Sequence, residues 1–595
     1  MLLARPLSTS LLRTFALTRT STSTLTRQFS RSAQVMASNT RSQGTEYKIK
    51  GLTSIDLKNG QMQEVEVEGI EEGKILLAKI KDEVHALGSK CTHYGAPLAK
   101  GILTPDGRLT CPWHGACFRV STGDVEDAPA LDPVAKFQVV ERDGAVYVKG
   151  DESTIKAARK SLSIKCQPKG QEHVVIVGSG SGAVGAIEGL RKDGFTGKIT
   201  CVSHEGTLPY DRPKLSKGLM TDASQIAWRS AEFYKEGGVD MANDQVTEVD
   251  FKAKKVKTKS GKEHSYTKLI LASGGTPNML PLPGLKGDLK NCFPLRTVKD
   301  VAAIMEAAGE DGGKKVVVVG SSFIGMEIGN ALAGKKHHVD IIGMEKEPME
   351  RVMGEKVGSI FRKLLEKNGV KFHMGASVEK GIESKSKSGH IGAVALKDGT
   401  ELEADLVVEG VGIRPATDYL KDNSAISLEK DGSISTDESF AVHGLKDVYA
   451  IGDIATYPYH GPGGNGKPVR IEHWNVAQNA GRSVAHTIAN PGSKPKSFIP
   501  VFWSAVGSQL RYCGHTPNGF DDVVVQGTTD VSEGKQSWVA YYTKGDEVQA
   551  VASMMKDPYM SQSAALMLRG KMPGKKELEK GVDIMQISVP AETKI

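Results

Sequence analysis

The chain has 595 residues, so several domains are expected. Hydrophobic residues make up 39% and charged residues 25% of it, as in ordinary globular proteins. The net charge is +7, and the first 45 residues, which contain no Asp or Glu, hold part of it. The remainder is nearly neutral, which gives no electrostatic case for nucleic-acid binding. Seven Cys are too few for a disulfide scaffold. No uninterrupted apolar run reaches the ~18 residues of a membrane span.

The first 45 residues have the composition of a targeting segment. They are rich in Arg, Ser and Thr, contain no acidic residue, and place several Leu where they can share one helical face. This composition is typical of a mitochondrial transit peptide, and Arg27–Ser30 resembles a matrix-processing site. We therefore expect a mitochondrial protein, in the matrix or the intermembrane space. The alternative is a disordered tail that carries no targeting signal. Translation from Met36 would remove the signal and leave a cytosolic form.

Residues 46–150 predict a small all-β domain, because short apolar runs alternate with Gly-containing turns. The expected strands are Glu64–Val67, Lys74–Ile80, Val84–Leu87, Arg108–Cys111, Phe137–Val140 and Ala145–Val148. The Lys-rich residues 151–171 are expected to form a linker with one short helix. A flexible linker of about 20 residues spans about 25 Å, so it would keep the flanking domains at millimolar effective concentration without a large, permanent interface.

Two Cys/His pairs in this β-domain indicate a metal or cluster site. Cys91 and His93 form C-x-H, and Cys111 and His114 form C-x-x-H after seventeen intervening residues. Two thiolates and two imidazoles could bind zinc. The residues that continue each pair, 94–98 and 115–118, closely resemble the Rieske domain family. The resemblance implies a [2Fe–2S] cluster, with Cys91 and Cys111 on one iron and His93 and His114 on the other.

Departures from the Rieske pattern predict a low reduction potential. Respiratory members have an additional Cys in each loop, joined as a disulfide, and those positions here are Ala96 and Trp113. They also place hydroxyl groups against the cluster sulfurs, where this chain has Ala116 and Phe118. Fewer hydrogen bonds stabilise the reduced cluster less, so the resemblance implies a ferredoxin-type cluster at the low end of the Rieske range.

From His173 the pattern changes to strands alternating with helices, which predicts doubly wound α/β domains. An apolar run at 174–177 ends in Gly178-Ser179-Gly180-Ser181-Gly182-Ala183, which fits the G-x-G-x-x-G/A turn of dinucleotide-binding units. Glu205 follows the next strand and could bond a ribose hydroxyl. A second such unit starts at the run 316–319. Beyond Pro495 apolar alternation returns, which predicts a small α+β C-terminal domain with strands at 523–525, 538–542 and 548–553.

Residues 172–510 resemble, in order and with family spacing, bacterial ferredoxin reductases and apoptosis-inducing factors. The segments that carry the resemblance are 208–217, 269–277, 448–455, 472–474 and 502–504. It implies bound FAD. The residues implied to contact it are Gly178, Gly180, Ala183, Glu205, Arg212, Lys217, Val246, Asp453, Glu472, His473, Trp474 and Trp503. Members of the family often have Arg where this chain has Asn278, which predicts a weaker FAD contact there.

The second turn departs from the nucleotide-binding pattern at one position. Gly320 and Gly325 fit, but Ser322 replaces the middle glycine and adds bulk where a pyrophosphate would bind. Glu345 follows the next strand, suits a ribose 2′-hydroxyl and disfavours a 2′-phosphate, so NADH is favoured over NADPH. The adjacent Lys346 leaves NADPH open. By resemblance, Gly412 lies in the turn near the nicotinamide.

The resemblance also implies the catalytic residues, Lys217 and Glu327, as a pair beside the flavin. No C-x4-C follows the first glycine-rich turn, so the disulfide of related reductases is missing, and the cluster would accept the electrons instead. The whole chain resembles apoptosis-inducing-factor-like proteins with an N-terminal Rieske domain.

The expected domains are a transit segment (1–45), a Rieske domain (46–150), a linker (151–171), an FAD domain (172–300, completed by 430–494), an NAD(P) domain (301–429) and a C-terminal domain (495–595). The expected activity is an NAD(P)H-dependent ferredoxin-reductase-like oxidoreductase that passes electrons to an unidentified one-electron acceptor, which could be a ferredoxin, a cytochrome or an oxygenase-type protein. The alternative is a redox-sensing or cell-death factor with slow turnover.

Overall fold

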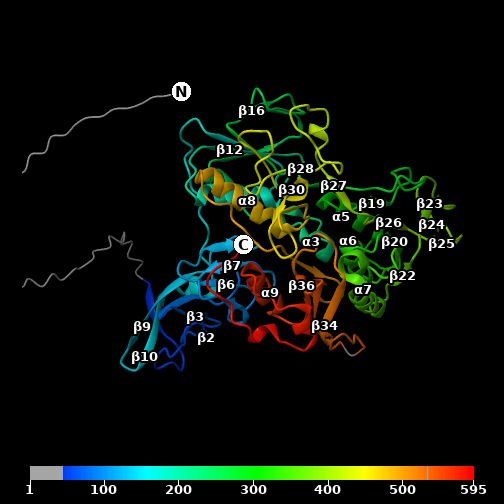
Figure 1. Ribbon diagram of the computed structural model, residues 1–595. Coiled ribbons are helices and arrows are strands. Elements are labelled where there is room, and N and C mark those ends of the chain that lie inside the picture. The colour runs from blue at the N-terminus through cyan, green and yellow to red at the C-terminus, as the bar shows by residue number, and fades with distance from the viewer. Residues whose placement is uncertain (1–43, 533, 595) are drawn as a thin grey trace, which may run out of the picture. The chain divides into compact units, whose positions relative to one another are not determined.

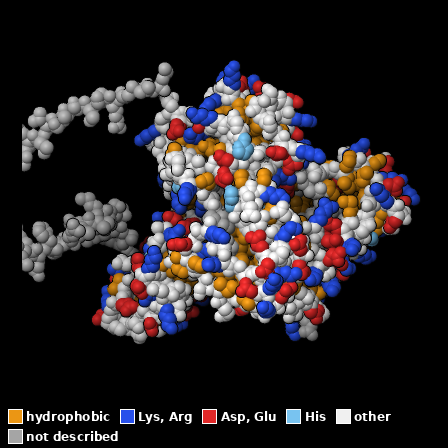
Figure 2. Space-filling model, in the orientation of Figure 1, with side chains coloured by type: hydrophobic (Ala, Val, Ile, Leu, Met, Phe, Trp, Pro, Cys, Tyr) orange, Lys and Arg blue, Asp and Glu red, His pale blue; other side chains and the backbone are white. Residues whose placement is uncertain are grey.

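The computed structural model describes residues 44–532 and 534–594, and Thr45–Ile595 form one compact unit (Figure 1). The expected transit peptide, 1–45, lies outside the described residues except for its last two. Among the described residues, no helix combines the length and the apolar character that crossing a bilayer requires. On the face shown in Figure 2, acidic and basic side chains are interspersed.

The N-terminal β-region consists of two antiparallel sheets. The larger has the order β1-β10-β9-β4-β3-β2, with bounds Thr45–Lys48, Ala145–Gly150, Lys136–Arg142, Glu83–Gly88, Lys74–Ile80 and Met62–Glu66. The smaller has the order β5-β6-β7-β8, with bounds Ile102–Leu103, Arg108–Thr110, Cys117–Arg119 and Val125–Asp127. All six predicted strands are present, with ends within two residues. The strands β1, β5, β7 and β8 were missed because they have only two to four residues, too few for a periodic pattern.

The first α/β sheet is fully parallel, with the order β13-β12-β11-β17-β29. Its strands are Val239–Asn243, Lys198–Ser203, His173–Val177, Lys268–Leu271 and Val448–Ala450. The helices α2 (Ser181–Lys192) and α8 (Trp474–Ala489) pack closely against each other, since a Cβ at Gly185 would lie 2.2 Å from the Gln478 carbonyl oxygen. Smaller elements complete this region: α3 (Pro213–Gly218), α4 (Ala231–Glu236), β14 (Val246–Asp250), β15 (Lys255–Thr258), β16 (Glu263–Ser265), β28 (Ile434–Ser435), β30 (Ala455–Tyr459) and β31 (Lys467–Val469).

The second α/β sheet repeats this arrangement, with the parallel order β19-β26-β20-β21-β22. Its strands are Cys292–Pro294, Leu406–Glu409, Lys315–Val319, His338–Gly343 and Lys371–Met374. The remaining elements are α5 (Val298–Ala308), α6 (Phe323–Gly334), α7 (Glu350–Lys367), β23 (Val378–Glu383), β24 (Ile391–Leu396), β25 (Glu401–Glu403), and the pair β18 (Gly275–Pro277) with β27 (Ile413–Pro415). In both sheets a glycine-rich turn follows the middle strand, as the two predicted dinucleotide-binding units require.

The C-terminal region is α+β, as predicted. Its antiparallel sheet has the order β32-β33-β36-β35-β34, with bounds Val501–Ala505, Gln509–Gly514, Glu547–Met554, Ser537–Lys544 and Asp522–Thr528. Two helices follow, α9 (Tyr559–Leu568) and α10 (Lys575–Glu579). Strand β32 lies between the N-terminal β-region and the first α/β sheet, and this position is central to the site described below.

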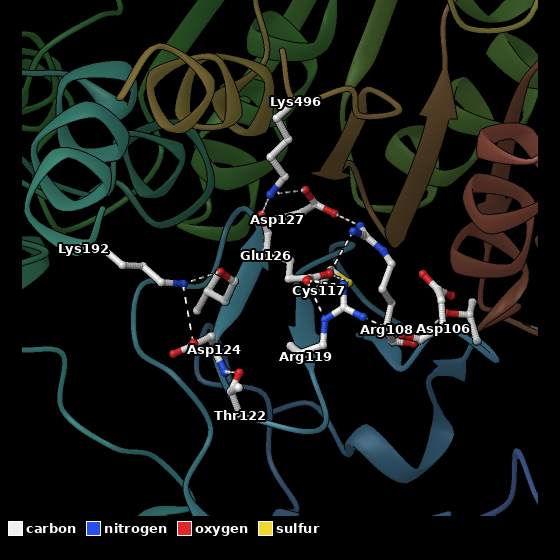
Figure 3. Close-up of polar contacts among 12 residues, drawn as sticks. Asp106, Arg108, Cys117, Arg119, Thr122, Asp124, Glu126, Asp127, Lys192 and Lys496 are labelled. Atoms are coloured by element: carbon white, nitrogen blue, oxygen red, sulfur yellow. Dashed lines mark hydrogen bonds and ion pairs between the residues drawn. The ribbon is translucent and has the colours of Figure 1, made fainter. Parts of the chain in front are cut away.

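Ion pairs hold the N-terminal β-region against the rest of the molecule. They join Asp132 to Arg229 at 2.7 Å, Asp106 to Arg569 at 2.7 Å, Asp127 to Lys496 at 3.2 Å and Asp124 to Lys192 at 3.9 Å. Figure 3 shows that part of this network centres on Arg108, which bonds Glu126 at 2.8 Å. Because the acidic partners all come from the β-region and the basic ones from four other segments, the charges are complementary across the contact.

The expectation of a flexible linker at 151–171 is wrong. The segment contains α1 (Glu152–Ala157) and then runs along the β-region, where the amide of Ala135 donates to the carbonyl of Ala158 at 3.1 Å. Ile164 is buried in the core of the first α/β sheet. The segment therefore contacts both the N-terminal β-region and the first α/β region. These contacts, rather than the length of a flexible linker, set the position of the two regions relative to each other.

Candidate active site

A cavity of about 680 Å³ opens at the carboxyl ends of the strands in the first α/β sheet. Gly178 has φ +100°, and a Cβ there would lie 2.3 Å from the Ala272 carbonyl oxygen, so only glycine fits this turn. A Cβ at Gly180 would meet no atom within 4 Å. Gly180 caps α2, and Gly180, Ser181 and Gly182 line the cavity, so the N-terminus of this helix adjoins it. This is a cradle for a pyrophosphate, and it fits FAD.

Charged side chains along the wall of this cavity are already paired with each other. Glu205 accepts from Arg212 at 2.6 Å and from the Tyr210 hydroxyl at 2.7 Å. Arg296 donates to Asp453 at 2.9 Å, and both line the cavity. Arg296 was missed at the sequence level, because it stands outside every recognised motif. Asn278 does not line the cavity, and it hydrogen-bonds to the 411–412 turn instead. The structure therefore shows no contact between Asn278 and the cavity that could be weakened.

The pair Lys217 and Glu327 meets at the wall of the cavity, as the resemblance implied. The Lys217 ammonium lies 2.9 Å from Glu327, which is buried at 4% exposure. The hydroxyls of Ser216 and Ser504 donate to the two carboxylate oxygens. Neither serine was predicted. Ser504 lies in segment 502–504, which carries the resemblance, but its contact with Glu327 joins positions more than 170 residues apart and has no local signal.

The second glycine-rich turn has the same backbone geometry as the first. Gly320 has φ +111°, and a Cβ there would lie 2.4 Å from the Gly410 carbonyl oxygen. Ser322 caps α6 in extended conformation, and its hydroxyl donates to the Gly410 carbonyl at 3.2 Å. The replacement is therefore accommodated by a hydrogen bond to the neighbouring strand end. From α6, residues Phe323, Ile324 and Glu327 reach the wall of the first cavity, so the two nucleotide sites adjoin.

Glu345 follows β21, at the position expected to bind a ribose. Its carboxylate accepts from Arg351 at 2.8 Å, and the arginine side chain is largely exposed. The Glu345 carboxylate is therefore paired with the guanidinium of Arg351, a contact that was not predicted from the sequence.

Of the predicted nucleotide-binding residues, twelve line the first cavity: Gly178, Gly180, Glu205, Arg212, Lys217, Val246, Glu327, Asp453, Glu472, His473, Trp474 and Trp503. Ala183 does not, because it is fully buried inside α2 against the sheet, where it serves the helix–strand packing. Gly320, Gly325, Glu345 and Gly412 belong to the second α/β region and lie outside this cavity. Burial raises the pKa of Glu472 and lowers that of His473 to about 3, so an uncharged imidazole lies beside the cavity.

The four predicted cluster ligands converge as two pairs. The thiols of Cys91 and Cys111 hydrogen-bond to each other, and each also accepts from two amides of its own loop. The Nδ1 atoms of His93 and His114 lie 3.0 Å apart. Burial lowers the pKa of His93 to about 3 and that of His114 well below its ordinary value, so both rings are neutral and can donate a lone pair to a metal.

This pairing fits the two irons of a Rieske cluster, one held by sulfur and one by nitrogen. Across residues 44–532 and 534–594, no three His, Cys, Asp or Glu side chains converge as a single-ion site. The cysteines at 91 and 111 are free, and so is Cys117, which is buried against Arg108 and Glu126.

The His pair lies directly against the cavity wall. The ring centroid of Trp503 is 4.5 Å from that of His114 and 5.3 Å from that of His93, and Trp503 also lines the cavity. Asn475 of α8 donates to the His114 carbonyl at 3.0 Å, and Ser561 of α9 donates to the Cys111 carbonyl at 2.7 Å. The second ligand loop is therefore held at both of its ligands by elements far away in the sequence.

The fold and these sites define a flavin- and nicotinamide-dependent oxidoreductase that also carries a Rieske [2Fe–2S] cluster. A family model for the Rieske [2Fe-2S] domain matches residues 48–138, and one for pyridine nucleotide-disulphide oxidoreductases matches residues 172–481. The chain belongs to the pyridine nucleotide-disulphide oxidoreductase family.

Known proteins resemble the chain over most of its length. Apoptosis-inducing factor 3 of Homo sapiens is 41% identical over 532 residues, which cover 88% of this chain and 84% of that protein. The Mus musculus protein of the same name is 40% identical over the same coverage. Among solved structures, the covalent putidaredoxin reductase–putidaredoxin complex aligns with a TM-score of 0.63 and 27% identity, over 69% of this chain and 96% of that chain.

Proposed function

We propose that this chain moves electrons from NADH, through FAD in the 680 Å³ cavity, to the Rieske cluster and on to a one-electron acceptor. The observation that carries the proposal is the position of Trp503, whose ring lines the flavin cavity and contacts both predicted histidine ligands. When bound, FAD supplies the step from hydride to single-electron chemistry, and the cluster supplies a one-electron carrier.

Protein side chains prepare the cavity for a ring that becomes electron-rich. The Lys217 ammonium lies at the cavity wall and provides positive charge there, while Glu327 and its two serine donors hold the ammonium in place. Because Glu327 is buried, its charge is compensated by a direct ion pair rather than by water. We propose Lys217 and Glu327 as the catalytic pair.

Strand β32 contributes residues to both predicted cofactor sites. Its residue Ser504 bonds Glu327, and the adjacent Trp503 contacts the histidine pair. Trp503 and Ser504 both line the cavity, and Trp503 also contacts the histidines, so one short strand serves both sites. The packed linker and the ion pairs described above keep the arrangement fixed, and no domain movement is needed to bring the cofactors together.

Replacing His114 with Ala tests the proposal. The variant loses a predicted iron ligand and should lose the cluster, while FAD stays bound and NADH still bleaches the flavin at a near-normal rate. Reduction of a one-electron protein acceptor should fall severely. His85→Gln, which changes another buried imidazole of the β-region, is the matched control. If acceptor reduction survives the loss of the cluster, electrons leave directly from the flavin and the proposal is wrong.

A second pair of variants examines Trp503 itself. Trp503→Phe keeps an aromatic ring between the sites, whereas Trp503→Leu removes it. With FAD content matched, stopped-flow reduction of the cluster by NADH should slow much more in the leucine variant than in the phenylalanine variant. Equal rates in the two variants would show that this ring is not part of the path.

A further inference from the structure

The histidine edge of the cluster site is closed in this protein. His93 is 8% exposed and His114 is 7% exposed, because Trp503 and Trp228 cover them from the flavoprotein side. The second ligand loop is sealed as well, since a Cβ at Gly115 would lie 3.1 Å from the Val501 side chain of β32. An external acceptor therefore cannot reach the imidazoles from this side while the β-region stays in place.

The first ligand loop, residues 90–100, is open. Tyr94 at its tip is 38% exposed, and its ring stacks on the His93 ring with 3.7 Å between centroids. A Cβ at the next residue, Gly95, would meet no atom within 4 Å. The loop is rigid, because the amide of Gly95 donates to the Cys91 carbonyl and the amide of Cys91 donates to the Ala96 carbonyl. The Tyr94 hydroxyl also donates to Asp211 of the flavin region.

The open loop is positively charged. Between Glu83 and Asp106 the chain contains Lys90 and Lys100 and no Asp or Glu. Both lysines are exposed, and neither is ion-paired to a residue that the structure describes. Across the seam, the Lys214 ammonium lies 5.4 Å from the centre of the Tyr94 ring, and its partner Asp211 is buried. A partner meeting this surface is favoured if it presents acidic side chains.

We propose that an acidic one-electron carrier protein docks on loop 90–100 and takes electrons from the cluster through the Tyr94 face. This inference rests on the proposed function and adds the exit face and the charge of the partner. The balance is one NADH and two oxidised carriers giving NAD⁺, one proton and two reduced carriers. Each carrier takes one electron, so the carrier docks twice for each NADH consumed.

Charge reversal on the loop tests this docking surface in the full-length holoprotein. The test variant is Lys90→Glu with Lys100→Glu, and the probe is an acidic [2Fe–2S] ferredoxin. The matched control is Lys58→Glu with Lys81→Glu, two exposed lysines at the turn beside Asn59 and Asp82. Lys81 precedes β4 and Lys90 follows it, so these two positions are separated by the length of the strand, about 20 Å at about 3.3 Å per residue.

We expect ferredoxin reduction by the loop variant to fall about tenfold at low ionic strength, and the gap to close as salt is added. The control should match the parent protein, and flavin bleaching and cluster reduction by NADH should be the same in all three proteins. Unchanged ferredoxin reduction in the loop variant, or faster reduction of ferredoxin than of a basic c-type cytochrome by that variant, would overturn the docking surface.

Two further measurements keep the alternatives apart. If NADH does not reduce the cluster even in the parent, the proposed function fails, and the docking surface is then tested by reducing the cluster with dithionite before mixing with ferredoxin. If electrons instead leave after the β-region swings away, Asp106→Ala, which breaks the pair with Arg569, should accelerate ferredoxin reduction. Acceleration of that kind would overturn the inference, whereas an unchanged rate supports exit from the docked state.

Discussion

Glu409 is a buried acid whose ionisation should destabilise the second α/β sheet. It ends β26 at 2% exposure, where one carboxylate oxygen accepts from the Leu280 amide at 2.6 Å and the other has no partner within the described residues. Burial raises its pKa to about 7, against the opposing effect of the Leu280 hydrogen bond. A raised pKa means that the folded state prefers the neutral acid, so the unfolded state ionises first as pH rises.

The sign and size follow from this difference in pKa. Below the unfolded pKa of about 4.5 the carboxyl is neutral in both states and costs nothing. The cost grows between pH 4.5 and 7 and is constant above, at about 3 kcal/mol for a shift of about 2.5 pKa units. Between pH 5 and pH 8 it rises by about 2.5 kcal/mol. Glu409→Gln removes this dependence, so the variant should gain stability over the parent as pH rises.

Native-state hydrogen exchange measures the effect in the sheet itself, without assuming that the whole chain unfolds in one step. For amides of β20 and β26, the ratio of variant to parent protection factors should increase roughly 70-fold from pH 5 to pH 8, which is 2.5 kcal/mol at 1.36 kcal/mol per decade. Glu401→Gln, the same change at an exposed site on β25, is the control and should show a constant ratio. A constant ratio for Glu409→Gln as well would refute the burial argument.

Three further outcomes are expected. The purified protein should contain FAD, acid-labile sulfide and roughly two iron atoms per chain; zinc without labile sulfide would contradict the assignment of Cys91, His93, Cys111 and His114. The kcat/KM for NADH should exceed that for NADPH by about tenfold or more, because Glu345 would repel a 2′-phosphate; an NADPH preference would mean that Glu345 does not face the ribose. In cells, N-terminal sequencing should show a mitochondrial protein that lacks about the first 30 residues, and a mature chain beginning at Met1 or Met36 would count against import.

Local motifs made much of this protein predictable from its sequence. The two Cys/His pairs and the two glycine-rich turns carry their chemistry in a few adjacent residues. Their spacing indicated a metal or cluster site and two nucleotide sites, and the resemblance of the residues after each Cys/His pair to the Rieske family indicated the cluster. Long apolar strands such as β3 and β20 were also predictable, because burial on both faces leaves a continuous apolar run. Several strands of two to four residues, such as β5, have no such signal and were missed.

Only the tertiary structure decided how these parts work together. Ser504 reaches Glu327 and Trp503 reaches the histidines through folding of segments that lie far apart in the sequence. The linker appeared flexible because its Lys-rich composition says nothing of the surface it packs against. The sequence specifies what each ligand or turn can bind, since that chemistry is local. Long-range packing decides which edge of the cluster site is closed and which loop stays open to a partner. The local pattern of residues contains no information on this packing.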